Sequence, residues 1–562
     1  MAAEATTPTT PCTSTTPILA QLISITAKCL ALDVEVKISS RPTPWETTSH
    51  LEFNVMASLA EQIAQFETLR AQAEPLPTDS AAYTTSAFFK SKNAGQGKSK
   101  AKAWDHRLSV DSRAQGSSPL KTANRGKNMD MITLGTARPS PQFYPYESLT
   151  VNVVDDASAK ENKPTTAITC SKGESAYNLA AALNYGFPAG SPQSVRFVTE
   201  HVEMMHNPPC EDWKTSLTCG TTSGLEMVFR IFCNPGDNIL VEKYSYTGTI
   251  VGARAQRINT VPIAMDEFGL SARELDSTLE NWDATKSHKP YVLYTIPTGQ
   301  NPTGVTQSVE RRKEIYAIAE KHDLIIVEDD PYFFLQMGEY SKLEVGSKEA
   351  LQEYVDKLPP SYLSLDVSGR VVRLDSTSKI LSPGLRLGWL TACTQIVDLF
   401  EAYSEVSVMS PSGPSQVMMY KLLDQTWGHT GFVRWLAHLS NVYTNRLNIM
   451  LEACEKHLPK DICSWRVPDS GMFVWINVDV TKHPKAPEGE PTKEFQMEIE
   501  GALYEKSRDH GVLISRGSWF LADPRQVSEA ALRVTFAAAT EPELAPGIER
   551  LGQAVREEFG LA

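Results

Sequence analysis

The sequence predicts an α/β protein that is built from more than one domain. Its 562 residues exceed what a single hydrophobic core can organise. Two apolar runs, residues 291–297 and 324–327, have the character of buried strands, and polar residues follow each of them. The stretch 217–224 leads into a helix with one apolar face, formed by Leu225, Val228, Phe229 and Phe232. Because α/β sheets keep their sites at the carboxyl ends of their strands, we expect a functional site at these polar strand ends.

Composition and charge narrow the class of protein. With 41% hydrophobic and 22% charged residues, the chain is typical of a soluble globular protein. Its formal net charge of -13 argues against a nucleic-acid-binding surface. Nine cysteines without a CxxC pair favour neither a disulfide framework nor a metal site, so we expect a reducing compartment, the cytoplasm. A mitochondrial location stays open, although Lys28 is the only basic residue among residues 1–32, which fits a transit peptide poorly.

Residues 1–103 look like an N-terminal extension that is largely disordered. Residues 1–17 are rich in Thr and Pro, and residues 18–32 are too short and too polar to cross a bilayer. A helix is possible within residues 51–73, where Val55, Leu59, Ile63 and Phe66 have helical spacing. Residues 90–102 hold five lysines among small residues, which favours a solvated linker over a phosphate-binding loop.

A single lysine in a turn is the centre of the predicted site. Residues 371–376 have the pattern of a strand that breaks into a serine-rich turn, and this turn presents Lys379. Ser376 and Ser378 supply hydroxyls just before the lysine, and Arg386 follows it. Hydroxyl groups donate hydrogen bonds, and an arginine guanidinium can donate two parallel hydrogen bonds to one anion. Together these side chains suit the binding of a phosphate. A lysine beside a phosphate site indicates pyridoxal 5'-phosphate (PLP) held through its aldehyde, whereas the alternative is a solvated turn lysine.

Ser376-x-Ser378-Lys379 followed by residues 384–388 resembles the cofactor-lysine segment of class I aminotransferases of fold type I, and is closest to the aromatic and 2-aminoadipate (kynurenine-type) branch. The resemblance covers about residues 104–560. It implies a large domain with a mixed, mostly parallel sheet flanked by helices, and a smaller α+β domain. The implied boundaries are 104–164 for an N-terminal arm and small-domain segment, 165–410 for the large PLP-binding domain and 411–562 for the C-terminal small domain.

Two loops with family counterparts concern the substrate and the partner subunit. Residues 132–145 resemble a loop usually written GGxPxPxxFP, but Thr136-Ala137 replaces the glycine pair and Arg138 follows. In relatives this loop lies by the substrate side chain, so Arg138 could face an acidic substrate, although we favour solvent. Residues 183–190 resemble the loop that delivers a tyrosine, here Tyr185, to the phosphate of the neighbouring subunit. That resemblance implies a homodimer with shared active sites.

Residues 328–330 place three carboxylates at the end of one predicted strand. The three groups repel each other, so we expect a cationic partner, which a protonated pyridine nitrogen would supply. The family's acid stands three residues before Tyr332, and this position selects Asp329 over Glu328 and Asp330. Asn301 follows the neighbouring strand. The resemblance implies that Asn301 and Tyr332 both form a hydrogen bond with the cofactor's phenolic oxygen.

The resemblance assigns the remaining roles. Tyr246, rather than Tyr244, is the ring expected to stack on the cofactor. Arg533 would bind the substrate α-carboxylate together with Asn301, whereas a structural salt bridge is the alternative. Lys379, Asp329 and Tyr332 are the expected catalytic residues. The expected phosphate ligands are Thr221, Thr222, Ser376, Ser378 and Arg386 of one subunit and Tyr185 of the other.

Transamination is the activity that the resemblance implies. An aromatic amino acid is the leading donor and a 2-oxo acid such as 2-oxoglutarate the acceptor, while 2-aminoadipate and kynurenine are alternative donors. A lyase or decarboxylase on the same fold is an alternative reaction. A transcriptional regulator with an aminotransferase-like body is a remote alternative, because residues 1–75 hold eight acids against four bases, where a DNA-reading domain should be positive.

Overall fold

The computed structural model describes residues 57–91, 95–116, 135, 137–154, 165–338 and 347–561. The chain divides into two units, Met1–Met56 and Ala57–Ala562, and the architecture below is that of the second unit. The expectations for residues 1–17, for residues 18–32 and for Thr136 lie outside the described residues. No helix of the described part is long and apolar enough to cross a membrane.

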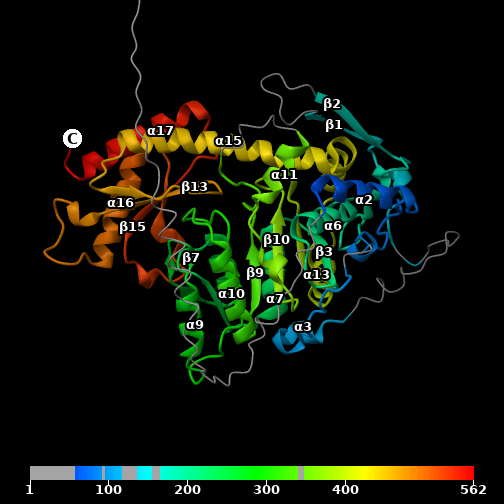
Figure 1. Cartoon of the computed structure of the whole chain (residues 1–562), viewed down its shortest axis with the longest axis horizontal. Helices are drawn as coiled ribbons and strands as arrows, with labels where there is room; N and C mark the ends of the chain where they lie inside the picture. The colour runs from blue at the N-terminus through cyan, green and yellow to red at the C-terminus, as the bar shows by residue number, and fades with distance from the viewer. Residues whose placement is uncertain are drawn as a thin grey trace, which may run out of the picture. The chain divides into compact units, whose positions relative to one another are not determined.

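A seven-stranded sheet forms the centre of the large domain (Figure 1). Its order is β3-β11-β10-β9-β8-β4-β5, and β11 runs antiparallel to both of its neighbours while the other pairs are parallel. The sheet is therefore mixed and mostly parallel, as predicted. The strands are β3 (Trp213–Thr218), β4 (Asn238–Glu242), β5 (Asn259–Ile263), β8 (Val292–Thr295), β9 (Ile325–Asp329), β10 (Val371–Ser376) and β11 (Gly388–Cys393).

Amphipathic helices pack on this sheet and bury their apolar faces in one large core. The helix predicted after residues 217–224 is α7, and its buried residues include Leu225, Val228, Phe229 and Phe232. The helices of the large domain are α3 (Val110–Ala114), α5 (Leu179–Ala182), α6 (Pro192–His206), α7 (Thr221–Phe232), α8 (Thr247–Ala255), α9 (Ala272–Glu280), α10 (Val309–His322), α11 (Lys348–Asp356), α12 (Tyr362–Leu365), α13 (Thr394–Ser407) and α14 (Gly413–Tyr420). Two hairpins lie outside the central sheet, β1 (Ser148–Val154) with β2 (Thr165–Ser171), and β6 (Met265–Asp266) with β7 (Gly269–Leu270).

The small domain has its own core around a four-stranded antiparallel sheet. Its strands are β12 (Cys463–Trp465), β13 (Phe473–Val478), β14 (Ser515–Arg516) and β15 (Ala530–Thr535), and its helices are α16 (Lys493–Asp509) and α17 (Glu541–Glu558). The long helix α15 (Gly428–His457) runs past both sheets (Figure 1). Leu436 of α15 belongs to the large core and Leu447 to the small one. The two cores therefore meet within α15.

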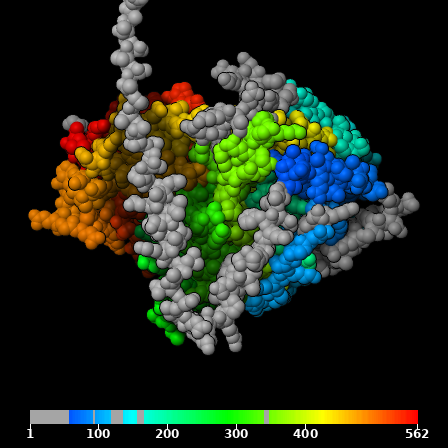
Figure 2. All heavy atoms as spheres, viewed as in Figure 1, coloured from blue at the N-terminus to red at the C-terminus, as the bar shows by residue number. Residues whose placement is uncertain are grey.

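The described part of the extension contains a helix and hydrogen-bonds to the large domain. Helix α2 (Leu59–Gln72) begins at Ser58, whose Oγ accepts a hydrogen bond from the Glu61 backbone NH. It buries Leu59, Ile63 and Phe66, three of the four residues on which the helix was predicted, while Val55 lies outside the described residues. Figure 2 shows α2, in blue, on the surface beside the pale-green α11.

The lysine-rich stretch is also more tightly bound than a solvated linker. Lys90 Nζ donates to the carbonyl oxygens of Glu211 and Trp213 at 2.7 and 2.9 Å, and it lies 4.8 Å from the centre of the Trp213 ring. Lys98 Nζ donates to Asn207 Oδ1 at 2.7 Å. The acceptors come from a segment more than a hundred residues away, so the local pattern of lysines could not reveal them.

Candidate active site

The predicted site residues gather at the carboxyl edge of the central sheet. Strands β9 and β10 run parallel, and Asp329 is paired with Leu374. The carboxyl end of β9 therefore lies beside the carboxyl end of β10. Asp329 closes β9, Ser376 closes β10, and Asn301 follows β8. The three polar groups therefore meet at one edge of the sheet, where α/β folds keep their sites.

Lys379 stands in the turn after β10 with its side chain partly buried. Thr377 holds this turn, because its backbone NH and its Oγ1 both donate to the carbonyl oxygen of Leu387, at 3.1 and 2.8 Å. Burial, followed by the positive charge of Arg533, lowers the pKa of Lys379. A lowered pKa favours the neutral amine, the form in which a lysine acts as nucleophile or base.

Asp329 is almost fully buried and has one oxygen without a partner. The Tyr294 hydroxyl donates to Asp329 Oδ2 at 2.7 Å, while Oδ1 is buried and has no hydrogen-bond partner in the described part of the chain. Burial raises the pKa of Asp329 to about 6. An unpaired buried carboxylate oxygen is costly, so this geometry suits a cationic ligand next to Oδ1.

The other two acids of the cluster have a partner that we did not anticipate. Arg373 is fully buried, and its Nη1 lies 3.0 Å from Glu328 Oε1 and 3.6 Å from Asp330 Oδ2. Its Nη2 lies 2.8 Å from Asp375 Oδ1. The expected cation for Glu328 and Asp330 is therefore the protein side chain Arg373. Among the described residues Asp329 has no such ion pair, which leaves it the best placed of the three acids to pair with a cationic ligand.

A cradle for a phosphate lies at the start of α7. Gly220 precedes the helix with φ +81°, and a Cβ there would collide with the guanidinium of Arg386. Arg386 thus lies against the free NH groups at the beginning of the helix, where Thr221 and Thr222 stand. Across the turn the backbone NH of Ser378 donates to Ser376 Oγ at 3.1 Å. Backbone donors, hydroxyls and one cation are the groups that a phosphate requires.

The two tyrosines that follow β4 have different surroundings in the structure. The Tyr246 ring packs over Gly248, where a Cβ would strike it, and it contacts the large core. Tyr244 turns toward the small domain, because its hydroxyl donates to Glu529 Oε1 at 2.9 Å and its ring centre lies 5.0 Å from that of Trp475. Tyr244 is therefore committed to packing, which leaves Tyr246 as the ring for a cofactor.

The side chain of Arg533, on β15, is fixed by hydrogen bonds and aromatic rings in an arrangement that suits an anionic ligand. Its Nη1 donates to Asn301 Oδ1 at 2.9 Å and its Nη2 donates to Ser515 Oγ at 3.0 Å. Its guanidinium carbon lies 4.7 and 4.6 Å from the ring centres of Phe473 and Phe520. Among the described residues Arg533 has no ion pair, so the structural salt bridge considered as the alternative is not found there. Tyr332, buried with its ring edge toward Phe473, completes this corner.

Two predicted residues lie outside this cluster in the single chain. Tyr185 is 55% exposed, in the loop between α5 and α6. Arg138 does not simply face solvent, the reading we favoured, because its Nη1 donates to the carbonyl oxygen of Ser80 at 3.1 Å. The acceptor belongs to the N-terminal extension, whose docking the sequence pattern did not indicate.

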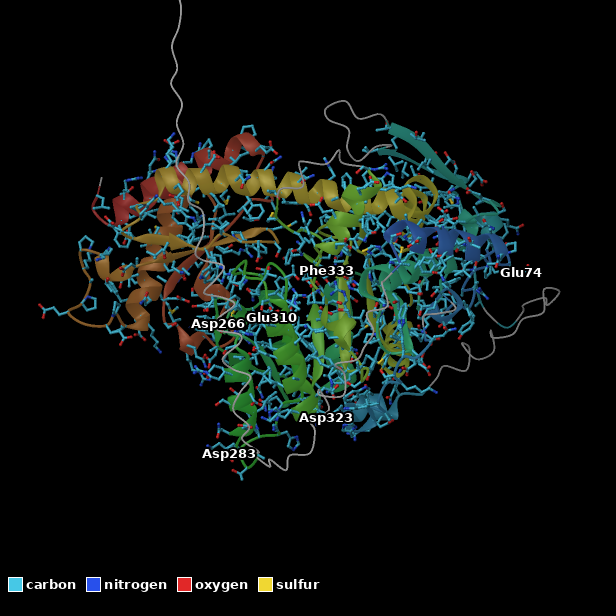
Figure 3. The ribbon with its side chains drawn as sticks, in the orientation of Figure 1. Glu74, Asp266, Asp283, Glu310, Asp323 and Phe333 are labelled. Carbon is cyan, nitrogen blue, oxygen red and sulfur yellow. The ribbon has the colours of Figure 1, made fainter. Side chains whose placement is uncertain are left out.

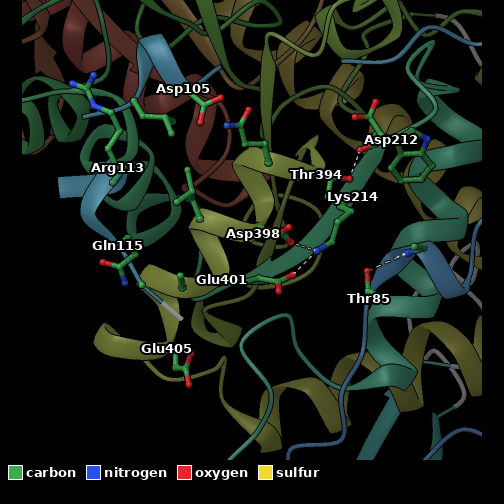
Figure 4. Close-up of a pocket in the computed structure, with 18 of the residues that line it drawn as sticks. Thr85, Asp105, Arg113, Gln115, Asp212, Lys214, Thr394, Asp398, Glu401 and Glu405 are labelled. Carbon is green, nitrogen blue, oxygen red and sulfur yellow. Dashed lines mark hydrogen bonds and ion pairs between the residues drawn. The ribbon is translucent and has the colours of Figure 1, made fainter. Parts of the chain in front are cut away.

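A separate cavity of about 810 Å³ lies away from these groups, beyond edge strand β3. None of the residues expected to hold PLP lines it, so the strand-end cluster, with its unpaired carboxylate oxygen, remains the better candidate for the chemistry. Figure 4 shows Lys214 in this cavity between Asp398 and Glu401, with Lys214 Nζ 2.5 Å from Asp398 Oδ1. These ion pairs tie β3 to α13 and explain the polar lining as a structural feature.

Five residues of the site were not predicted from the sequence. Arg373 and Asp375 alternate on one face of a strand, which could have indicated a buried pair. Tyr294 is a hydroxyl inside an apolar strand, and a buried tyrosine usually has a hydrogen-bond partner. Gly220 and Ser515 gave no such signal, because their importance depends on side chains that are distant in the sequence.

Known proteins agree with this geometry. The family model for aminotransferases of class I and II matches residues 149–551. The aminotransferase swnA of Arthroderma benhamiae is 48% identical over 463 residues, 82% of this chain and 92% of that protein. An aromatic amino acid aminotransferase of Schizosaccharomyces pombe is 40% identical over 81% of this chain and 98% of that protein. The crystal structure of the aminotransferase Aro8 from Candida albicans matches with a TM-score of 0.75 and 38% identity, over 83% of this chain and 100% of that chain.

The chain therefore belongs to the class I and II aminotransferases. It is an enzyme that transfers an amino group between an amino acid and a 2-oxo acid, in a family that depends on PLP. The predicted family, the fold type I architecture and the reaction class are confirmed.

Proposed function

We propose that this enzyme binds PLP at the strand-end cluster around Lys379 and transfers the amino group of an aromatic amino acid to a 2-oxo acid such as 2-oxoglutarate. The observation that carries the proposal is the arrangement of Lys379, the half-paired Asp329 and the Arg386 cradle at one edge of the sheet. The name of the S. pombe relative described above, an aromatic amino acid aminotransferase, supports the aromatic donor.

The residues present fit PLP. The unpartnered Asp329 Oδ1 would accept a hydrogen bond from a protonated pyridine nitrogen. Gly220, Thr221, Thr222, Ser376, Ser378 and Arg386 would hold the phosphate. Tyr246 would cover the ring, and Asn301 with Tyr332 would reach its phenolic oxygen. Bound PLP supplies an electron sink that makes the α-proton of an amino acid removable.

The protein's own residues orient the substrate and move its proton. Arg533 would bind the α-carboxylate through the guanidinium protons that Asn301 and Ser515 leave free. The two phenyl rings on either side fix the plane of this guanidinium, and so the direction of the α-carbon. The Nζ of Lys379, with its lowered pKa, then takes the proton from that carbon.

A homodimer is part of the proposal. In a single chain the Tyr185 side chain is 55% exposed, and its hydroxyl has no hydrogen-bond partner among the described residues. A second copy would place this hydroxyl at the phosphate of the neighbouring site.

The substrate assignment is tested with a panel of amino donors. The purified enzyme with PLP and 2-oxoglutarate would be assayed for glutamate and for the 2-oxo acid made from each donor. We expect the highest kcat/KM for tyrosine, phenylalanine or tryptophan. A higher kcat/KM for 2-aminoadipate or kynurenine would replace the aromatic donor, and release of keto acid without glutamate would contradict transfer to 2-oxoglutarate.

The central lysine is tested by Lys379→Ala. This substitution removes the only amine that the proposal uses, so turnover should fall to background and the absorbance of lysine-bound PLP should disappear, while circular dichroism stays unchanged. Lys286→Ala is the control, because the Lys286 side chain is 81% exposed and pairs only with Asp283 among the described residues. Turnover that survives in Lys379→Ala would remove the assignment.

A further inference from the structure

The N-terminal extension contacts two loops that the family resemblance places at the active site, and the proposed function uses one of them, the Tyr185 loop. The carbonyl oxygen of Ser80 accepts a hydrogen bond from Arg138, in the loop expected by the substrate side chain. The ring centre of Tyr83 lies 5.3 Å from that of Phe187, with the planes at 85°. Phe187 is two residues beyond Tyr185, in the loop expected to reach the partner's phosphate.

Contacts on both sides hold this part of the extension in place. Before it, Arg70 of α2 donates through Nε to Glu200 of α6 at 2.9 Å, and its Nη2 lies 3.0 Å from Asp424. Gln193 of α6, only 1% exposed, donates to the carbonyl oxygen of Pro77 at 3.2 Å. The segment is therefore attached to the helix that directly follows the Tyr185 loop.

After Tyr83, the chain covers the edge of the central sheet. Ser86 is fully buried, and its Oγ accepts a hydrogen bond from the backbone NH of Thr215 in edge strand β3, at 2.9 Å. An edge strand leaves such donors unpaired unless another segment covers them. Phe88 packs edge-on against Tyr83 with ring centres 5.7 Å apart, so the aromatic contact continues from the loop to the edge of the sheet.

We propose that residues 77–88 are a brace that holds the Tyr185 loop in the conformation needed for PLP binding, with Tyr83 as its positioning residue. The proposal rests on the proposed function, because it assumes that Tyr185 serves a cofactor phosphate. The physical reason is preorganisation. A loop with an exposed tyrosine loses conformational entropy when its hydroxyl is fixed on a ligand, and contacts that order the loop beforehand reduce this loss. Phe187, 7% exposed, is the anchor through which Tyr83 acts on the loop.

The test compares four full-length proteins: the wild type, Tyr83→Ala, Tyr83→Phe and Glu74→Ala. Tyr83→Ala removes the ring against Phe187, whereas Tyr83→Phe keeps it. Glu74 is exposed at the outer end of α2 (Figure 3) and serves as the matched control in the same extension. Two quantities would be measured: the Kd of the apoenzyme for PLP, by absorbance titration, and hydrogen exchange of peptides covering residues 183–190 and 473–478 without PLP.

For Tyr83→Ala we expect the Kd for PLP to rise by about threefold to tenfold, the range that one aromatic pair provides. Exchange should accelerate in residues 183–190 and stay unchanged in 473–478, the strand β13 of the small domain. Tyr83→Phe and Glu74→Ala should match the wild type. The proposal would be contradicted by an unchanged Kd for PLP or by an unchanged exchange rate in residues 183–190. Equal acceleration of exchange in both peptides would also contradict it.

Two provisions keep the outcome decisive. If Tyr83→Ala does not fold, Phe88→Ala removes the outer ring, whose side chain is 60% exposed, and the same shifts are expected with smaller size. If the wild type binds no PLP, the proposed function has failed, but the exchange of residues 183–190 in the apoenzyme still shows whether Tyr83 orders the loop.

Discussion

Asp329 shows how the chemistry of one residue depends on which of its atoms are satisfied. Tyr294 occupies Oδ2 and nothing in the described part of the chain occupies Oδ1. Arg373 neutralises the neighbouring acids Glu328 and Asp330, so they do not compete for a ligand cation. Of three adjacent carboxylates, two are therefore paired with Arg373 and one, Asp329, forms no such ion pair among the described residues.

The raised pKa of Asp329, about 6 against 3.8, has a consequence for stability without PLP. A carboxyl whose pKa is raised by folding contributes stability below pH 3.8, and this contribution is lost as the pH rises through 6. The Asp329→Asn variant does not lose stability in this way, because its amide side chain does not ionise. Relative to the wild type, the unfolding free energy of this apo-variant should therefore increase by about 2 kcal/mol between pH 4 and pH 7.5. Urea unfolding at both pH values measures it, and a difference that does not change with pH would contradict the burial of an ionisable Asp329.

At the scale of elements, the start of α7 is the feature that the site depends on most. The helix leaves its first NH groups unpaired and directs its dipole at them, which favours an anion. Gly220 permits the positive φ of the turn and the close approach of Arg386, and no other residue type would satisfy both conditions. One glycine therefore brings the helix and the arginine of another segment together.

Gly220→Ala should weaken PLP binding more than it weakens the fold. The new Cβ would displace the Arg386 guanidinium, and losing a charge-assisted hydrogen bond of that kind should raise the Kd for PLP about tenfold or more. Gly547→Ala in α17 is the matched control, because a Cβ there meets only Val512 at an ordinary 3.8 Å. Equal Kd values for the two variants would show that Arg386 does not hold the phosphate.

At the scale of the whole molecule, the two domains both contribute residues to the candidate site, and the proposed dimer would add a residue from a second copy of the chain. Arg533 comes from the small-domain sheet and Asn301 from the large domain, and their hydrogen bond joins the two domains at the proposed substrate position. Helix α15 contributes to both cores and links the same two domains on another side. Among the described residues the Tyr185 hydroxyl has no hydrogen-bond partner, and the proposed dimer would give it one.

Shared sites predict that two defective variants restore each other. Lys379→Ala and Tyr185→Ala would be mixed, dissociated and reassociated at limiting PLP. Each mixed dimer would have one site with both defects and one site with Lys379 and the partner's Tyr185 intact, so activity should recover to about a quarter of the wild-type value if the subunits combine at random. Each variant treated alone is the control. Activity in the mixture equal to the mean of the two controls would mean that each subunit uses its own tyrosine.

The sequence by itself determined the α/β class, the lysine turn and the polar ends of the predicted strands, because these follow from short-range periodicity and from residues that are close in the chain. The family resemblance of those same segments gave the reaction class. Only the tertiary structure decided that Arg373 is the partner of Glu328 and Asp330, and that Arg138 and Lys90 bind backbone carbonyls of distant segments. It also showed that the N-terminal extension contacts the large domain, where Ser86 accepts a hydrogen bond from edge strand β3. These outcomes depend on acceptors and packing surfaces that are far away in the sequence, and no local pattern of charge or hydrophobicity encodes them.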